Sequence, residues 1–187
     1  MMLLRSFIPP LGMMLLAAGQ AGAQGVLIEK SEIRFAFRKM GVGLSGRFRR
    51  WKANIVFLPR DLAHSKVEID IDLSSLDVAN DEFEGELKQP AWLDVERHPV
   101  ARFVSTSIKH QGGNRYQVTG TLSLKGITRE ITVPMTLRKD ASGNNVAEGS
   151  FALNRLEHKL GEGASIDSRA LPAEVNVQLR VVLPAVR

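Results

Sequence analysis

The chain of 187 residues contains no cysteine and carries a formal net charge of +5. The lack of cysteine excludes a disulfide framework, a thiolate metal site, a cysteine nucleophile, haem attachment through cysteine and an N-terminal lipid-modified cysteine. The length suits one domain with its own hydrophobic core.

The first residues of the chain, 1–23, have the order of a secretory signal peptide. Arg5 is the only charged residue before Glu29, an apolar stretch covers 7–18, and small residues end at Ala21-Gly22-Ala23. The apolar stretch is shorter than the ~20 residues that a membrane-spanning helix needs. We therefore expect cleavage after Ala23, a mature domain over 24–187, and a periplasmic location without a lipid anchor. A retained N-terminal membrane anchor is the alternative.

From residue 26 onward, apolar and polar residues alternate with a period of two, which is typical of half-buried β-strands. Turn-forming residues such as Gln111-Gly112-Gly113-Asn114 separate several runs, and short connections favour antiparallel neighbours. About eight strands with one apolar face each predict an all-β fold, an eight-stranded antiparallel up-and-down barrel, because closure hides those faces and leaves no free edge. A sandwich of two sheets is the alternative. The runs cover 33–38, 44–48, 53–57, 67–73, 101–109, 116–124, 131–138, 146–155 and 175–183.

Two segments depart from simple alternation. Even-numbered residues point inward from Leu44 to Phe48, whereas odd-numbered residues do so from Ala53 to Phe57. This change of parity predicts a β-bulge between 48 and 53. The segment 74–98 does not alternate, and its acidic residues at 81–84 suit the first turn of a helix. We expect one or two short helices there, covering part of the barrel.

Parity also defines an apolar inner face on which a ligand can lie. Arg155 continues the inward parity, and we expect it to meet a polar head group at the barrel mouth, to form a buried ion pair or to snorkel. Gly46 and Gly120 lie on the same face, where they either make room for a ligand or allow the strands to coil. The other inward residues that we expect to line a tunnel are Phe35, Phe37, Phe48, Phe57, Ile69, Phe103, Val118, Leu122, Val133 and Phe151.

Charged residues are unevenly distributed along the chain. The basic segment 34–52 contains no acid, and it predicts either a contact with an anionic membrane surface or an ordinary solvated strand face. We do not expect nucleic acid as a partner outside the cytoplasm. Glu68, Asp70 and Asp72 project from one side of one strand, and we expect them to pair with basic residues of the strand over 44–57. The four histidines form no spaced motif, so the sequence predicts no metal site.

The order of these elements resembles the YceI-like family over residues 26–183. The most specific stretch is Tyr116–Ile131, which is similar to the family's Gly-x-Leu-Thr-x-x-Gly-Val-Thr segment. Asn154-Arg155 matches a recurring feature near the last hairpin. The chain departs from the family at Lys39, where histidine is common, and at Glu84-Gly85-Glu86-Leu87, where Arg-Asp-x-His-Leu is common. The resemblance is also carried by Phe37 through Phe48, by Trp92-Leu93-Asp94-Val95 and by His98 through Phe103.

The resemblance implies an extended lipocalin-like barrel with a polyisoprenoid, such as a ubiquinone or another polyprenyl lipid, in a long apolar tunnel. We therefore expect a periplasmic carrier for such a lipid, without a covalent cofactor. One alternative is a ligand-free interaction module that partners a membrane redox complex. Another is an enzyme that acts on lipids, but the sequence shows no base and nucleophile that would converge on the cavity. The sequence does not indicate the oligomeric state or the head group of the ligand.

Overall fold

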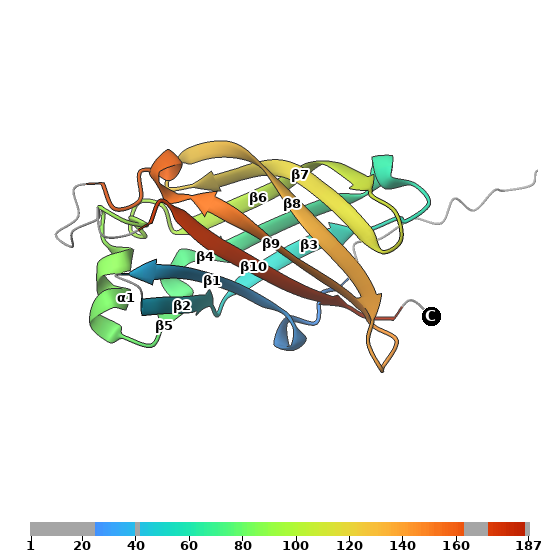
Figure 1. The fold of residues 1–187 in the computed structure, drawn as a ribbon, viewed down its shortest axis with the longest axis horizontal. Coiled ribbons are helices and arrows are strands. Elements are labelled where there is room, and N and C mark those ends of the chain that lie inside the picture. The colour runs from blue at the N-terminus through green and yellow to red at the C-terminus, as the bar shows by residue number, and fades with distance from the viewer. Residues whose placement is uncertain (1–24, 40–41, 163–171, 186–187) are drawn as a thin grey trace, which may run out of the picture.

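The computed structural model describes residues 25–39, 42–162 and 172–185. Their fold is a single antiparallel sheet of ten strands with one short α-helix (Figure 1). The expected signal peptide lies outside the described residues. The strands are β1 (Glu32–Lys39), β2 (Val42–Phe48), β3 (Trp51–Val56), β4 (Lys66–Asp72), β5 (Leu76–Val78), β6 (Val100–His110), β7 (Arg115–Leu124), β8 (Ile127–Lys139), β9 (Asn145–Asn154) and β10 (Glu174–Leu183).

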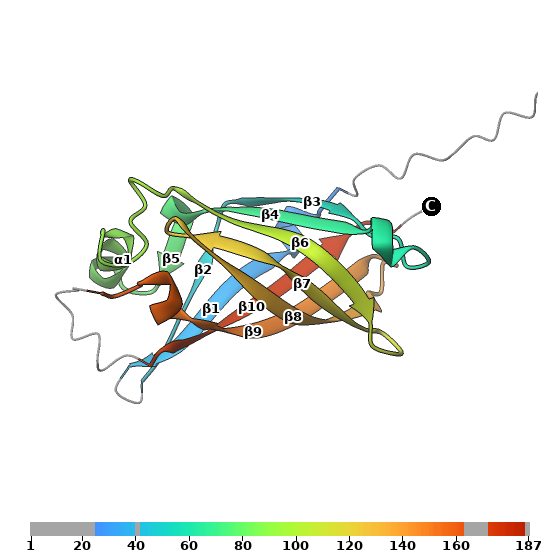
Figure 2. The ribbon, with the colours of Figure 1, turned by 90° about the horizontal axis from the view of Figure 1, so that it is seen from above.

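The sheet curls into an elongated barrel around its own apolar face (Figures 1 and 2). Its strand order is β3-β4-β6-β7-β8-β9-β10-β1-β2-β5, and each described pair of neighbours is antiparallel. The first strand of this order, β3, follows directly after β2 near the other end. The two ends of the sheet therefore adjoin, and the prediction of an antiparallel barrel rather than a two-sheet sandwich is confirmed.

The number of strands is ten rather than the expected eight, because two long strands are interrupted. One chain segment breaks at Arg49–Arg50 between β2 and β3, and its neighbour breaks at the 3-10 helix η3 (Leu73–Ser75) between β4 and β5. Backbone hydrogen bonds join the two breaks: the Arg49 amide donates to the Ser75 carbonyl at 3.1 Å, and the Asp72 amide to the Arg50 carbonyl at 3.0 Å. The paired interruption turns both strands together around the barrel.

The prediction of a β-bulge between 48 and 53 is therefore wrong, because the strand is interrupted there. The change of parity there reflects the break between β2 and β3, after which β3 pairs with β4 instead of with β1. A register irregularity does occur elsewhere, between Ser105 and Ser107 in the β6–β7 pair. The sequence pattern around these residues did not reveal it.

The segment after β5 forms the helix α1 (Asp81–Lys88), as the acidic first turn predicted. The Asn80 side chain caps it by accepting a hydrogen bond from the Phe83 amide at 2.7 Å. Leu87 on its inner side is buried, and α1 lies at one end of the barrel (Figure 1). Residues 76–78 form the short strand β5, which the expectation of helices alone over 74–98 missed. None of the helices in the described part of the chain combines the length and the apolar character needed to cross a membrane.

One pair of neighbouring strands is only partly joined. The ladder between β8 and β9 runs from Lys139 opposite Asn145 to Met135 opposite Gly149, and it stops there. Residues 127–134 of β8 and 150–154 of β9 continue as strands, paired with β7 and β10 respectively but not with each other. We call this gap in the ladder the β8–β9 split. Figure 1 shows the two strands together near the hairpin at 140–144 and diverging toward the end that holds α1.

Candidate functional site

The interior of the barrel contains an elongated apolar cavity of about 250 Å³. Inward-facing residues of most of the strands line it, and the loop after α1 adds Trp92 and Leu93 at one end. Among the described residues of the lining, Arg155 is the only charged one, and Tyr116 and Thr136 supply the only side-chain hydroxyl groups. The cavity therefore offers a long molecule almost nothing except apolar contact.

Two clusters of buried side chains form the walls. The first surrounds the α1 end and contains Phe35, Leu73, Leu76, Leu87, Trp92, Ala101, Leu122, Leu124, Leu153 and Leu160. The second lies toward the far end and contains Ile33, Trp51, Ile55, Ile69, Val181 and Leu183. Because Phe48, Ile71 and Phe103 pack against both clusters, the apolar lining is continuous from one to the other.

The structure places all eleven residues that were predicted to line a tunnel on the wall of this cavity. Contact with a ligand at these positions stays a prediction. The residues are Phe35, Phe37, Phe48, Phe57, Ile69, Phe103, Val118, Leu122, Val133, Phe151 and Arg155. The parity argument missed the contribution of residues 76–93, since Leu76, Leu87 and Trp92 belong to the segment without alternation. The apolar stripe of Leu87 and Trp92 in the sequence was the signal that could have placed them there.

Arg155 closes the α1 end rather than projecting freely from it. Its side chain is buried, and its Nη1 donates to the Leu160 carbonyl at 2.7 Å while its Nε donates to the Pro172 carbonyl at 2.9 Å. The guanidinium carbon lies 5.8 Å from the centre of the Trp92 ring. Burial lowers the pKa of Arg155. The residue therefore ties two main-chain segments to Trp92, a role that the sequence did not predict.

A second set of contacts holds the same end together. Lys125, in the β7–β8 turn, donates from Nζ to the Ala91 carbonyl at 3.2 Å and to the Lys159 carbonyl at 3.0 Å. The Gly161 amide donates to the Ala91 carbonyl at 2.8 Å. Gly161 has a φ of 82°, and a Cβ there would lie 2.8 Å from the Trp92 ring. Glycine is therefore required where this turn passes over the tryptophan.

Gly46 and Gly120 do not leave open space for a ligand. A Cβ at Gly46 would collide with the ring of Phe35, and one at Gly120 would lie 2.6 Å from Cζ of Phe103. Neighbouring aromatic rings occupy the volume that the missing side chains release. Of the two interpretations of these glycines, the structure supports close packing of the wall rather than a wider tunnel.

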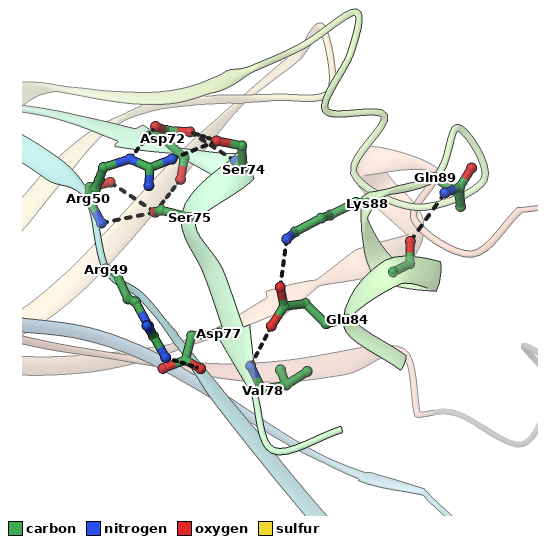
Figure 3. Close-up of polar contacts among 11 residues, drawn as sticks. Arg49, Arg50, Asp72, Ser74, Ser75, Asp77, Val78, Glu84, Lys88 and Gln89 are labelled. Atoms are coloured by element: carbon green, nitrogen blue, oxygen red, sulfur yellow. Dashed lines mark hydrogen bonds and ion pairs between the residues drawn. The ribbon is translucent and has the colours of Figure 1, made fainter. Parts of the chain in front are cut away.

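Ion pairs cover the outside of the barrel. As predicted, Asp70 and Asp72 pair with basic residues of the preceding segment, Lys52 at 3.5 Å and Arg50 at 2.9 Å. Arg102 on the other neighbouring strand also pairs with Asp70, at 2.9 Å, and with Glu68, at 3.5 Å. Figure 3 shows Arg50 between Asp72 and Ser74.

The basic segment 34–52 is more neutralised than its sequence suggests. Arg49 contacts Asp77 at 2.9 Å (Figure 3). Arg47 also hydrogen-bonds to Asp77, at 2.7 Å, and the two arginines together lower the pKa of Asp77 to about 2. Arg34 pairs with Glu32 at 2.6 Å. Carboxylates from outside the segment thus compensate much of this charge, and contact with an anionic membrane surface stays a prediction.

Comparison with known proteins identifies the family. The model of the YceI-like domain matches residues 26–183. The UPF0312 protein of Serratia proteamaculans is 33% identical over 182 residues, covering 94% of this chain and 93% of that protein. The UPF0312 protein of Pseudomonas savastanoi is 32% identical over 178 residues, covering 90% and 92%.

Solved structures show the same fold. Burkholderia cenocepacia BcnA superposes with a TM-score of 0.79 at 29% identity, covering 84% of this chain and 98% of that one. A polyisoprenoid binding domain from Saccharophagus degradans superposes with a TM-score of 0.69 at 16% identity, covering 88% and 99%. With the family model matched from β1 to β10 and relatives of nearly equal length, the chain belongs to the YceI-like family.

Proposed function

We propose that this protein binds a polyisoprenoid lipid or an isoprenoid quinone in its barrel and carries it through the periplasm. The observation that carries the proposal is the elongated cavity, whose lining contains a single charged side chain. A tail in this cavity gains ~0.8 kcal/mol for each CH₂-sized group that leaves water, so affinity needs few polar contacts. An eight-stranded barrel is wide enough for one slender ligand.

The relatives support a lipid ligand in a general way. The domain from Saccharophagus degradans is described as polyisoprenoid-binding, and it shares the fold of this chain. That the ligand of this chain is an isoprenoid, with quinones included, is our proposal. A shared fold at 16% identity does not show that two proteins bind the same ligand.

Catalysis has little support in the cavity. Within the described lining, the polar side-chain groups belong to Trp92, Tyr116, Thr136 and Arg155, and no carboxylate or imidazole is present to act as a base. A ligand-free interaction module would need no such cavity. Binding is therefore the function that the geometry supports best.

Substitution of a cavity residue by tryptophan tests the proposal. Val133 is buried and lines the cavity, whereas its neighbour Thr132 is exposed on the outer face. Val133→Trp should raise the Kd for a fluorescent geranylgeraniol at equilibrium, while Thr132→Trp should leave it unchanged. Overpacking costs ~1–3 kcal/mol, so thermal unfolding must first show that both variants fold. Equal Kd values for two folded variants would refute binding at this site.

Export is a separate part of the proposal. The order of charge, apolar stretch and small residues before Gln24 supports cleavage after Ala23. The intact mass of protein from the periplasmic fraction should correspond to a chain that begins at Gln24. A full-length species that remains with the membrane would refute this part without affecting the binding proposal.

A further inference from the structure

The β8–β9 split differs from the other long seams of the barrel. Between β6 and β7, pairing extends from Arg102 opposite Ser123 to His110 opposite Tyr116. Between β9 and β10 it covers the full length of β9. Across the split, no residue of 127–134 pairs with 150–154. Opening the barrel at either of the fully paired seams would break a ladder of hydrogen bonds, whereas opening it at the split would break none.

The split has a cause in the sequence. The position that would extend the ladder beyond Met135 opposite Gly149 is Pro134, which has no amide hydrogen to donate. Proline in a sheet is confined to edges and places where pairing ends. At Gly149 the strands still touch, since a Cβ there would lie 2.6 Å from the Pro134 carbonyl oxygen. Pairing therefore ends abruptly at Pro134.

The opposite end of the split is bounded by the 3-10 helix η4 (Arg155–His158), which follows β9 directly. His158 is only 1% exposed and lies against the backbone of Leu124, the last residue of β7, and of Ile127, the first residue of β8. The split is thus a defined interval, held at one end by η4 and at the other by the remaining β8–β9 ladder.

Apolar side chains close the interval between these two ends. Ile131 and Phe151 are half-buried there, and both line the cavity. Among the described residues, no backbone ladder closes the wall along this line, and side chains change rotamer far more readily than a strand pair separates.

A positively charged side chain, that of Arg129, lies beside the β8–β9 split. Arg129 lies directly opposite Leu122, so both side chains leave the sheet on its inner face, and Leu122 lines the cavity. Arg129 is nevertheless exposed, and no carboxylate of the described residues is within ion-pair distance of it. It is also close enough to His158 to lower the pKa of that imidazole. Its side chain thus runs from the inner face to solvent beside η4.

We propose that the β8–β9 split is the doorway through which the apolar ligand enters and leaves the barrel sideways, with Arg129 receiving its polar end. This inference rests on the proposed function. A sideways route lets a long tail move into the cavity without unthreading the capped α1 end, where Trp92, Arg155 and Lys125 tie the loops together. It also accounts for an exposed arginine on the inner face that has no carboxylate of the described residues within ion-pair distance.

A cross-link over the split tests the doorway. Thr132 and Ala152 are exposed on facing strands and lie opposite each other if the β8–β9 register is continued. The double variant Thr132→Cys/Ala152→Cys introduces the only cysteines of the chain, and a short bismaleimide can bridge them where a disulfide is too short. The matched control is Ala152→Cys/Asn176→Cys, which joins directly paired residues of β9 and β10.

The measurement is the release rate of preloaded fluorescent geranylgeraniol into excess acceptor vesicles. We expect the bridged split to slow release by about tenfold or more, as for a closed gate, and the control bridge to leave the rate unchanged. Pro134→Val, which restores an amide hydrogen, should slow release without any cross-link. Unchanged rates in a bridged protein that still binds the probe would overturn the doorway alone. Absence of probe binding in the parent protein would overturn the proposed function.

A separate binding experiment tests whether Arg129 contacts the polar end of the ligand. Arg129→Gln should raise the Kd for geranylgeranyl phosphate while leaving that for geranylgeraniol unchanged, because only the phosphate can pair with the guanidinium. Equal Kd values of the parent and the variant for the phosphate would overturn the placement of the polar end at Arg129.

Discussion

The β6–β7 seam and the β8–β9 seam join long neighbouring strands of the same barrel, yet they are held by different forces. The first is hydrogen-bonded from Arg102 to His110, whereas the second keeps only its hairpin half, from Met135 to Lys139. In the remainder of the second seam the two strands pair only with their other neighbours, β7 and β10, and the half-buried side chains of Ile131 and Phe151 lie between the cavity and the gap. The difference shows that a barrel can keep its shape while two neighbouring strands share no ladder over part of their length.

Truncation of a buried side chain should give the largest difference in the free energy of unfolding between the paired wall and the β8–β9 split. Ile33 lies on β1 opposite Leu179 of β10 and is 1% exposed, so Ile33→Ala should lower the free energy of unfolding by ~2–5 kcal/mol. Ile131→Ala, at the β8–β9 split, removes the same atoms from a half-buried site and should cost clearly less. Urea denaturation measures both. Equal losses would mean that the split is packed as firmly as the paired wall.

Replacement of Gly120, on the paired part of the wall, should show how tightly the side chains pack there. A Cβ at Gly120 would meet the Val104 carbonyl and the Phe103 ring, so Gly120→Ala should destabilise the fold by ~1–3 kcal/mol. Gly43 on β2 has nothing within 4 Å of the corresponding position and provides the control. Gly43→Ala should be neutral or slightly stabilising. A tolerated Gly120→Ala would show that the Phe103 ring can leave without penalty.

Hydrogen exchange should report the same contrast without any mutation. About half of the amides in a strand face each neighbour. We expect those of residues 150–154 that face β8 to exchange faster than the corresponding amides of residues 145–149, which keep the ladder. NMR-detected exchange resolves the two groups, and equal protection would argue against a weakly held seam.

Acid should loosen the η4 end of the split. Burial lowers the pKa of His158 from its ordinary value of 6.5, so the folded protein holds this imidazole neutral where the unfolded chain binds a proton. Stability from His158 is therefore complete above about pH 6.5 and declines as the pH falls toward the lowered pKa. His158→Gln should flatten this part of the stability curve, whereas His110→Gln, at an exposed position, should not. A parent curve without any decline in this range would contradict the prediction.

The alternation of side chains predicted most of the fold and the cavity wall. Residues such as Phe35, Val118 and Phe151 can be assigned to the inner face because a strand repeats every two residues. The local sequence did not reveal that Arg49–Arg50 is a break rather than a bulge, since both change parity in the same way. Only the partner strand distinguishes them, through the hydrogen bonds to Ser75.

The features that alternation missed depend on contacts between distant segments. The role of Arg155 requires Leu160, Pro172 and Trp92 to come together, and no spacing in the sequence predicts that meeting. The β8–β9 split did have a local signal. Pro134 interrupts an otherwise regular strand, and its missing amide hydrogen indicates that one neighbour must stop pairing there.

The central claim is that the barrel interior holds an isoprenoid, and organic extraction tests it most directly. Protein purified from the periplasm without detergent should release a long-chain polyisoprenoid or isoprenoid quinone on extraction, identified by mass spectrometry. The same extraction from a folded Val133→Trp variant should yield less of it. An extract of the parent protein without any such molecule, together with no binding of added polyprenol, would contradict the account.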